Sequence, residues 1–384
     1  MIIGVPKEIV IGENRVSVTP DTTGKLIKLG FVVLVEKDAG SCASFTDDKY
    51  IAAGAKIIEN VTDLFSQADI VLKVQKPVFN HKLNKDEIDL IKKGTMLITF
   101  LFPLNFPELA KDCAAREIDV ISMDSIPRIT IAQKMDALSS QSNLAGYKSV
   151  LMCANELGKI FPLMMTAAGT ITPAKVVIMG AGVAGLQALG TAKRLGAVVE
   201  VSDIRPSAKE DIQSLGGRFI EIESDESLQD EGGYAKEVSE EFLRKQKALL
   251  YKHITEADIV ITTALVPGKK APVLVTEEMV KNMKPGSVIL DMAVEFGGNC
   301  EPSEAGKTII KHNVKIIGET NIPSLVPVNA SEMYSKNLLG LIQHFSEDGK
   351  LIIDKDDEIL KSALISYKGE VVQEKVLEII KKQN

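Results

Sequence analysis

Short runs of apolar, β-branched residues alternate with amphipathic segments along the whole chain. In the N-terminal region the runs of strand length are Ile2–Val5, Val32–Glu36, Ile70–Val74, Met96–Phe100 and Val120–Met123. The segments with helical spacing between them are Asp21–Leu29, Asp47–Ala53, Lys85–Lys93 and Pro107–Arg116. Strands this apolar are covered on both faces, and strands that alternate with helices form βαβ units. The pattern therefore predicts a doubly wound, parallel α/β sheet.

A second series of strands repeats this alternation further along the chain. Its members are Val176–Met179, Val198–Ser202, Arg218–Ile222, Asp258–Thr263, Ser287–Met292 and Val314–Ile317. Apolar residues at helical spacing over Ser139–Gly158 predict a long helix between the two series, and helices return in Glu332–Phe345 and Glu374–Lys382. We therefore predict two Rossmann-like, doubly wound parallel-sheet domains joined by long helices. The second domain, residues 139–329, is inserted into a first domain of residues 1–138 plus 330–384.

Composition and charge narrow the classes of function. The 384 residues are 45% hydrophobic and 25% charged, which is typical of a globular protein, and the formal net charge is −7. An acidic chain without a clustered basic face is a poor candidate for a protein that binds nucleic acid. The four cysteines form no CxxC pair and the four histidines have no metal-ligand spacing, so we expect no metal site.

We expect no targeting segment and no membrane span in the chain itself. The first eight residues lack a basic segment followed by an apolar one, as a secretory signal has. The longest uncharged run, Val176–Ala192, contains four glycines and is shorter than the roughly 20 residues that a spanning helix needs.

A glycine motif stands where the second series begins. Gly180, Gly182 and Gly185 follow the strand Val176–Met179 and open a helix over Leu186–Leu195. In a dinucleotide-binding turn the first glycine permits the tight bend, the second lets the backbone approach the pyrophosphate, and the third lets helix pack on strand. The helix N-terminus then offers unpaired N–H groups to the phosphates. The context predicts a dinucleotide site.

The next strand ends in Asp203, eighteen residues after the last glycine. A carboxylate at this place binds the ribose hydroxyls of the adenosine and repels a 2′-phosphate, so we predict NAD(H) rather than NADP(H). Arg205 complicates this choice, because a nearby arginine sometimes accepts the 2′-phosphate. Later strand ends, including Ala264 and Leu265, and the tract Asn321–Ser324 are expected at the same crevice.

Two further segments carry polar residues whose role the pattern leaves open. The acidic stretch Glu221–Lys236 has no periodicity, and is either a solvated insertion or a loop that closes on ligand through Gly232, Gly233 and Tyr234. The tract Arg128–Gln141 precedes the long helix. Its polar residues either position a carboxamide or, in the case of Asp136 and Ser139, cap that helix.

Several motifs together resemble one known family. Pro6-Lys7-Glu8, Glu13-Asn14-Arg15-Val16 and Thr19-Pro20 look like the opening shared by alanine dehydrogenases and the NAD(H)-binding components of proton-translocating nicotinamide nucleotide transhydrogenases. The same two branches are matched by Lys73–Pro77, Gly180–Gly185, Val266–Pro272 and Lys284–Ser287, so that the resemblance covers essentially the whole chain.

The two branches differ after the strand Met96–Phe100. Alanine dehydrogenases carry a catalytic histidine there, whereas this chain has Phe102 in that place. Oxidation of an amino acid needs a group that manages protons, and phenylalanine cannot do so. Direct hydride transfer between two nicotinamide rings needs orientation instead. Arg15, Lys73 and Asp291 look like substrate or catalytic residues of alanine dehydrogenases, retained here either as buried structural ion pairs or as a residual substrate pocket.

The resemblance also implies a set of site residues. The Arg128–Gln141 tract is similar to the transhydrogenase signature, which implies that Arg128, Asp136 and Ser139 hold the nicotinamide and that Gln133 reaches the NADP(H) of a partner. The catalytic residues expected on this basis are Gln133, Arg128, Asp136 and Ser139. The cofactor contacts expected are Arg128, Gln133, Lys134, Met135, Asp136, Ser139, Gly180, Gly182, Val183, Gly185, Asp203, Ile204, Arg205, Gly233, Tyr234, Gln246, Ala264 and Leu265.

The implied function is that of the NAD(H)-binding subunit of a proton-translocating transhydrogenase. NADP(H) would then lie on a partner subunit, and a separate membrane-spanning subunit would carry the protons. The resemblance further implies a homodimer, placed peripherally on the cytoplasmic side of the inner membrane. Two alternatives stay open, a soluble alanine dehydrogenase-like enzyme and a non-catalytic NAD(H)-binding module.

Overall fold

The computed structural model describes residues 1–221, 240–265 and 268–383, with backbone alone for 240–247 and 383. The chain forms two compact units. The first unit comprises Met1–Gln141 and Pro323–Asn384, and the second unit comprises Ser142–Ile322. Along the chain, the second unit is thus inserted into the first. Within the described residues, no helix combines the length and apolar character needed to cross a bilayer.

The first unit is built on an eight-stranded sheet of order β21-β20-β8-β7-β4-β1-β2-β3. Its strands are β1 (Ile2–Val5), β2 (Val32–Glu36), β3 (Lys56–Ile58), β4 (Ile70–Leu72), β7 (Met96–Thr99), β8 (Asp119–Ser122), β20 (Leu364–Tyr367) and β21 (Glu370–Val371). The run from β3 to β8 is parallel, whereas β20 and β21 add an antiparallel edge that the sequence analysis did not include.

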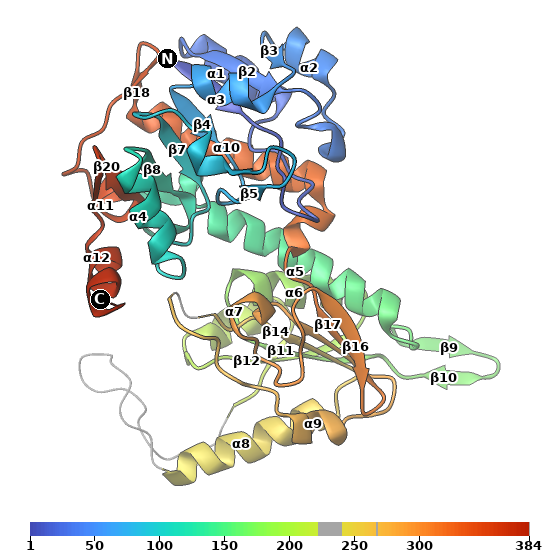
Figure 1. The fold of residues 1–384 in the computed structure, drawn as a ribbon. Helices are drawn as coiled ribbons and strands as arrows, with labels where there is room; N and C mark the ends of the chain where they lie inside the picture. The colour runs from blue at the N-terminus through green and yellow to red at the C-terminus, as the bar shows by residue number, and fades with distance from the viewer. Residues whose placement is uncertain (222–239, 266–267, 384) are drawn as a thin grey trace. The chain divides into compact units, whose positions relative to one another are not determined.

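Helices and short turns complete the first unit (Figure 1). The α-helices are α1 (Pro20–Lys28), α2 (Asp47–Ala52), α3 (Val61–Gln67), α4 (Pro107–Ala115), α10 (Pro327–Phe345), α11 (Glu358–Ala363) and α12 (Glu374–Gln383). The 3₁₀ turns are η1 (Ser41–Ala43), η2 (Glu87–Asp89), η3 (Met123–Ser125) and η4 (Thr130–Met135). The two-residue strands β5 (Phe79–Asn80) and β6 (Lys85–Asp86) pair, as do β18 (Ser346–Glu347) and β19 (Lys350–Leu351).

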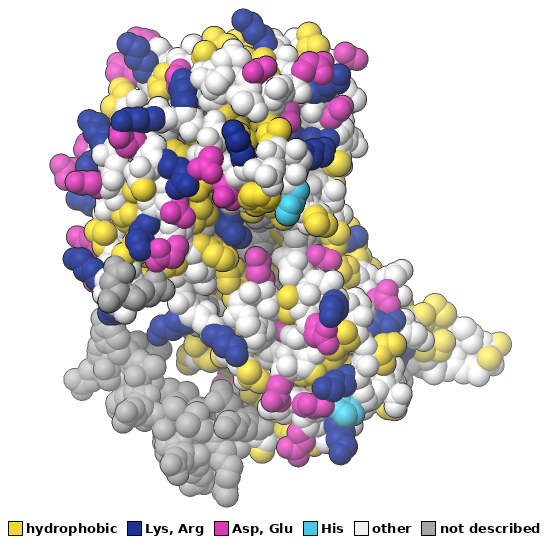
Figure 2. Space-filling model, in the orientation of Figure 1, with side chains coloured by type: hydrophobic (Ala, Val, Ile, Leu, Met, Phe, Trp, Pro, Cys, Tyr) yellow, Lys and Arg dark blue, Asp and Glu magenta, His cyan; other side chains and the backbone are white. Residues whose placement is uncertain are grey.

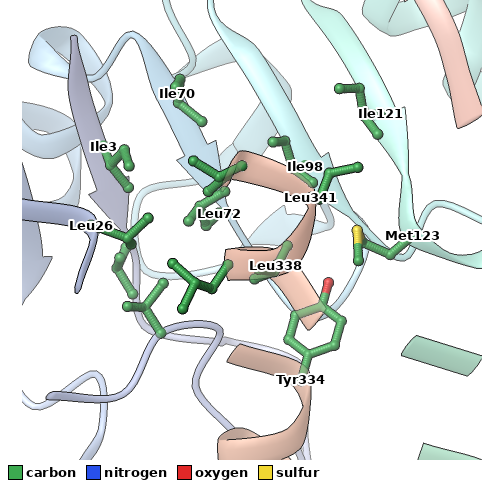
Figure 3. Close-up of a cluster of buried hydrophobic side chains, with 14 of the residues drawn as sticks. Ile3, Leu26, Ile70, Leu72, Ile98, Ile121, Met123, Tyr334, Leu338 and Leu341 are labelled. Carbon is green, nitrogen blue, oxygen red and sulfur yellow. The ribbon is translucent and has the colours of Figure 1, made fainter. Parts of the chain in front are cut away.

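The returning tail packs its long helix against the first sheet. Tyr334, Leu338 and Leu341 of α10 lie among side chains from β1, β4, β7 and β8 (Figure 3). The Tyr334 hydroxyl donates to the Lys73 carbonyl oxygen (2.8 Å), so the polar end of this buried ring is satisfied. The helix expected over Glu332–Phe345 is present, but it starts earlier, at Pro327. Its buried side chains form part of the first core.

One predicted helix of the first unit is wrong. Residues 85–86 form β6 and residues 87–89 form the turn η2, and residues 90–93 follow without an α-helix. The cause is Glu87, whose carboxylate points inward, accepts a bond from Lys73 Nζ (2.9 Å), and accepts another from the Val78 N–H (3.0 Å). These buried bonds hold the segment in a single turn, which amphipathic spacing alone does not reveal.

The second unit is built on a seven-stranded sheet of order β13-β12-β11-β14-β15-β17-β16. Its strands are β11 (Lys175–Met179), β12 (Val198–Ser202), β13 (Arg218–Phe219), β14 (Ile259–Thr262), β15 (Val288–Asp291), β16 (Lys307–Lys311) and β17 (Val314–Gly318). All are parallel except the edge strand β16. This is the strand order of a dinucleotide-binding fold, with its switch point between β11 and β14. The structure therefore confirms two doubly wound α/β domains.

The remaining elements of the second unit are helices and one projecting hairpin. They are α6 (Val183–Arg194), α7 (Ala208–Ser214), α8 (Glu240–Thr255), α9 (Glu277–Lys281), the turns η5 (Val294–Phe296) and η6 (Ile322–Leu325), of which η6 spans the boundary, and the hairpin β9 (Met164–Thr166) and β10 (Gly169–Ile171). The long helix α5 (Ala137–Glu156) begins in the first unit and continues into the second. A Cβ on Gly146 of α5 would stand 2.2 Å from the Ala184 carbonyl oxygen, so this glycine allows α5 and α6 to pack closely.

Candidate functional site

The glycine turn lies at the switch point of the second sheet, where the crevice of an open α/β fold forms. Gly180 follows β11 with φ +111°, a conformation that favours glycine. A Cβ on Gly185 would stand 1.8 Å from the Gly180 carbonyl oxygen, whereas a Cβ on Gly182 would meet no protein atom within 4 Å. The three glycines thus have the bend, the open approach and the close helix–strand packing that a pyrophosphate-binding turn requires.

Asp203 lies beside this turn, at the end of β12. Its Oδ2 accepts a bond from the Ala181 N–H (2.7 Å), and its Oδ1 accepts bonds from the N–H (2.8 Å) and Nε (2.9 Å) of Arg205. Burial tends to raise the pKa of Asp203, but the bonds from Arg205 and the Ala181 N–H outweigh it and hold the pKa below the usual range. The carboxylate is therefore ionised at neutral pH, with its present hydrogen bonds donated by Ala181 and Arg205.

Exposed apolar side chains surround the turn. Val183 at the start of α6, Ile204 beyond β12 and Leu265 beyond β14 are all exposed, and Ile204 is 90% exposed. Apolar side chains held at the crevice of a dinucleotide fold suit the flat faces of the bases. Ala264 is fixed by Asn299, whose amide accepts a bond from the Ala264 N–H (3.0 Å) and donates to its carbonyl oxygen (2.9 Å).

Asp291 is part of the frame beneath this site and not of its surface. It is fully buried, and its carboxylate accepts bonds from Thr262 Oγ1 (3.1 Å), from the Asn299 N–H (2.9 Å) and from Ser303 Oγ (2.6 Å). Of the two interpretations left open for this residue, the contacts favour the structural one. Asp291 orients Asn299, and Asn299 in turn holds Ala264.

The Arg128–Gln141 tract belongs to the first unit. Asp136 Oδ1 accepts a bond from the Ser139 N–H (2.9 Å) and Oδ2 accepts one from Ser139 Oγ (2.6 Å). Asp136, which accepts both bonds from Ser139, caps the start of α5, as the alternative interpretation expected. Arg128, Gln133 and Lys134 are exposed and available to a ligand or partner. The Met135 side chain is fully buried in the first core, so the predicted cofactor contact from this side chain has no structural support.

Helix α10 contacts the Arg128–Gln141 tract through Asn337. Asn337 Nδ2 donates to the Lys134 carbonyl oxygen (2.9 Å), and Asn337 Oδ1 accepts a bond from Ser140 Oγ (2.7 Å). One buried amide therefore ties η4 to the first turn of α5. Asn337 could not be predicted from sequence, because an asparagine in an amphipathic helix carries no signal until its partners are known.

Phe102 follows β7 in a left-handed conformation with φ +52°, which is uncommon for a bulky residue. Asp124 Oδ1 holds the loop by accepting bonds from the Leu101 N–H (3.0 Å) and the Phe102 N–H (2.9 Å). The ring of Phe102 stacks on Phe100 at a centroid distance of 5.8 Å. By the resemblance described above, Phe102 stands where alanine dehydrogenases carry a histidine. The side chain at this position is therefore an aromatic hydrocarbon ring.

Arg15 and Lys73 are buried and paired within the first unit. Arg15 forms an ion pair with Glu13 (2.6 Å) and donates to Gln141 Oε1 (2.9 Å). Lys73 is fully buried, and its Nζ lies 2.9 Å from Glu87 Oε1 and 3.3 Å from Glu8 Oε2. These contacts favour the structural interpretation of both residues over a residual substrate pocket.

Stability is expected to depend on pH through Glu8. Burial, only partly opposed by Lys73, raises the pKa of Glu8 from its ordinary value of 4.5 to about 7. The folded chain thus holds a proton that the unfolded chain releases, so stability falls as pH rises from 4.5 through 7, by about 3 kcal/mol for a shift of this size. Urea unfolding of the wild type and Glu8→Gln at pH 5, 6, 7 and 8 should show a flatter pH dependence for the variant. Parallel curves would contradict this origin.

The remaining predicted residues are either not described by the structure or have other contacts. Gly232, Gly233 and Tyr234 lie outside the described residues, and the side chain of Gln246 in α8 is not among those described. Two residues of the tract Asn321–Ser324 make structural contacts. Ile322 is buried in the second core, and buried Ser324 Oγ accepts a bond from the Asn14 N–H (2.7 Å) and donates to the Gly12 carbonyl oxygen (2.7 Å).

The second unit meets the requirements of a dinucleotide in its own geometry. The position beside Gly182 is open to a phosphate, the N-terminus of α6 begins there, and an ionised carboxylate stands at the end of the neighbouring strand. The second unit combines the strand order, the glycine turn and the acidic strand end of a dinucleotide-binding fold. The protein is therefore of the class of two-unit α/β proteins that contain such a fold.

Comparison with known proteins identifies the family within this class. Residues 4–145 match the N-terminal domain and residues 149–374 the C-terminal domain described as alanine dehydrogenase/PNT. The chain therefore belongs to the alanine dehydrogenase/PNT family.

Individual relatives come from both branches of the family. An NAD(P) transhydrogenase subunit alpha polypeptide of Rhodospirillum rubrum is 50% identical over 97% of this chain and 98% of its own. The alanine dehydrogenase of Bacillus subtilis is 31% identical over 98% and 94%. Among solved structures, a transhydrogenase from Sinorhizobium meliloti superposes with a TM-score of 0.87 at 42% identity, covering 97% of this chain and 100% of that one. The alanine dehydrogenase branch is thus the more distant one.

Proposed function

We propose that the chain is the NAD(H)-binding component of a proton-translocating NAD(P) transhydrogenase. Hydride passes between NADH on this chain and NADP⁺ held on a partner subunit, in the manner of the Si/Re-specific enzymes. Relatives named as transhydrogenase alpha subunits at 43–50% identity over nearly the full chain support this assignment, and the alanine dehydrogenases at 30–31% are more distant.

The observation that carries the choice between the two branches is Phe102. Amino-acid oxidation requires a general acid–base group beside the reacting carbon. The residue after β7 instead offers a hydrocarbon ring stacked on Phe100, in a loop fixed by Asp124. Arg15 and Lys73, which resemble substrate-binding residues, are paired with carboxylates of the same unit. A free amino acid therefore meets neither a proton acceptor at Phe102 nor an unpaired cation at these two positions.

The roles proposed for the chain's own residues are those that the resemblance to transhydrogenases implies. Asp203 binds the adenosine ribose through its ionised carboxylate, and the Gly180–Gly185 turn with the N-terminus of α6 binds the pyrophosphate. Asp136 and Ser139, locked together at the start of α5, orient the carboxamide of the ring. When bound, the dinucleotide supplies the hydride-carrying nicotinamide. The proposed role of Gln133, whose side chain is exposed, is to reach the nucleotide of the partner.

The partners proposed are a second copy of the chain, an NADP(H)-binding subunit and a membrane subunit that carries protons. The Haemophilus influenzae subunit alpha is matched over 72% of its length, so that relative contains a further segment. For the homodimer, support comes from the β9–β10 hairpin, which projects from the second unit (Figures 1 and 2). Its strand β9 carries exposed Met164 and Met165. Such a short hairpin is marginal by itself and gains stability from a covering partner. The location proposed is the cytoplasmic face of the inner membrane.

A binding and transfer assay tests the function. NADH is titrated by its fluorescence, which tryptophan does not obscure because the chain has none. We expect binding by the chain, no reduction of NAD⁺ with L-alanine, and NADH-dependent reduction of an NADP⁺ analogue once the NADP(H)-binding and membrane subunits of a relative are added. Light scattering of the same sample reports the dimer.

The Gln133→Ala variant separates binding from transfer. It should bind NADH like the wild type yet transfer hydride more slowly, because its side chain is exposed and contributes to no core. Equal loss of both properties would deny Gln133 a bridging role. Alanine-dependent formation of NADH by the wild type would overturn the proposed function.

A further inference from the structure

The carboxylate of Asp203 has no acceptor position left over within the second unit. A carboxylate offers about four acceptor positions, two on each oxygen. The main-chain N–H groups of Ala181 and Arg205 take one on each oxygen. The Arg205 guanidinium takes the other two, through Nε to Oδ1 (2.9 Å) and through the Nη2 group to Oδ2 (3.1 Å).

The Arg205 guanidinium is held by two different acceptor groups. Besides the fork on Asp203, the Nη2 group of Arg205 donates to the Ala181 carbonyl oxygen (3.2 Å), which belongs to the glycine turn. The Asp203 side chain is only 7% exposed, whereas that of Arg205 is 57% exposed. The carboxylate is thus rigidly placed, and the arginine is the partner that can move without disturbing the core.

The same acceptor positions are those that an adenosine ribose needs. Its 2′- and 3′-hydroxyls donate to the strand-end carboxylate, so the diol and the guanidinium compete for Oδ1 and Oδ2. A 2′-phosphate has the opposite requirement, because it is repelled by Asp203 and bound by an arginine fork. In this chain the fork that would bind the phosphate is already occupied by the carboxylate that repels it.

We propose that Asp203 and Arg205 act as one specificity device, in which Asp203 withholds the Arg205 guanidinium from a 2′-phosphate. Selection of NAD(H) then has two parts, repulsion by the carboxylate and sequestration of the arginine. The inference rests on the proposed function, in which NADP(H) is bound elsewhere and must be kept out of this site. It adds Arg205 as a latent phosphate receptor that is released when the charge of Asp203 is removed.

The test compares two probes of the adenosine subsite alone, 5′-AMP and adenosine 2′,5′-bisphosphate, on the full chain by calorimetry. The four proteins are the wild type, Asp203→Ser, Arg205→Gln and the double variant. Asp203→Ser should bind the bisphosphate at least about tenfold more tightly than the wild type does, which is about 1.4 kcal/mol. The double variant should lose this gain. Arg205→Gln should bind 5′-AMP as well as the wild type or a few-fold more tightly, since its competitor is gone.

Each other result overturns the proposal. Bisphosphate binding that is equal in Asp203→Ser and in the double variant would show that Arg205 is no receptor. An Arg205→Gln variant that loses 5′-AMP binding would show that the guanidinium contacts the nucleotide instead of competing with it. Asp203→Asn, which keeps the shape of the side chain, repeats the test should Asp203→Ser fail to fold. Wild-type chain that binds NADH while no variant gains bisphosphate affinity defeats this inference alone, whereas wild type that binds no NADH defeats the proposed function as well.

Discussion

Gly185→Ala is expected to abolish most NADH binding and to destabilise the second unit. The added Cβ would stand 1.8 Å from the Gly180 carbonyl oxygen and 2.9 Å from its carbonyl carbon, and both are backbone atoms that no rotamer change can move. Helix α6 must therefore shift away from β11, or the turn must open. Overpacking of this kind costs about 3 kcal/mol, and an equal loss in binding lowers affinity roughly a hundredfold.

Two other glycines provide matched controls. Gly182→Ala places its Cβ in open space, so this variant should keep the wild-type melting temperature while weakening NADH binding, because the methyl group projects where the phosphates approach. Gly190 lies in the same helix α6, and its Cβ would meet only the mobile end of Arg194 (3.4 Å). Gly190→Ala should bind NADH normally and gain up to about 1 kcal/mol of stability. Normal binding by Gly185→Ala would contradict the geometry of the turn.

The elements best predicted from sequence are those whose pattern is set by burial on both faces. The strands Ile2–Val5, Val32–Glu36 and Val198–Ser202 have the predicted bounds. The glycine turn was equally predictable, because a left-handed bend and a close helix–strand approach each demand glycine at a fixed position. Such constraints are local, so they are written in the sequence itself.

The failures come from edges and from buried charges. The antiparallel strands β16 and β20 lie at or near sheet edges, where alternation is weak and pairing is decided by the rest of the sheet. The spacing of residues 85–93 predicts a helix, whereas in the structure Glu87 points inward and pairs with Lys73. A carboxylate paired through the core cannot be distinguished from a solvated one by spacing.

The candidate site divides in the same way. Gly180, Asp203 and Ala264 could be placed because strand ends and turns determine them. The residues that hold the site in place were missed, since Asp124, Asn299 and Asn337 are ordinary polar residues whose roles depend on partners far along the chain. Gly146 did carry a signal, because a glycine inside a helix costs about 1 kcal/mol and calls for a packing reason.

Lys73→Met should produce the largest loss of stability in the first unit. The ammonium group is fully buried between the carboxylates of Glu8 and Glu87, each of which also accepts a bond from a main-chain N–H group. Burial lowers the pKa of Lys73, but the two carboxylates outweigh this and raise the pKa above its ordinary value, so the charge is firmly held. Methionine fills the space but leaves the carboxylate of Glu87, and that of Glu8 where it ionises above about pH 7, without a cation in the core. Breaking a buried pair costs about 3–5 kcal/mol, or roughly 10 °C in melting temperature.

The pH dependence of this loss distinguishes charge from packing. Without Lys73 the two carboxylates take up protons in the folded chain, so the destabilisation by Lys73→Met should be smaller at pH 5 than at pH 8. Adding Glu87→Gln should recover part of the stability at pH 8, because one of the unpaired charges is removed. Lys37→Met, which breaks an exposed ion pair with Glu59 in the same unit, should change the melting temperature little. A loss that is equal at both pH values and unaffected by Glu87→Gln would mean that Lys73 stabilises the fold by filling volume, and not by neutralising the carboxylates that surround it.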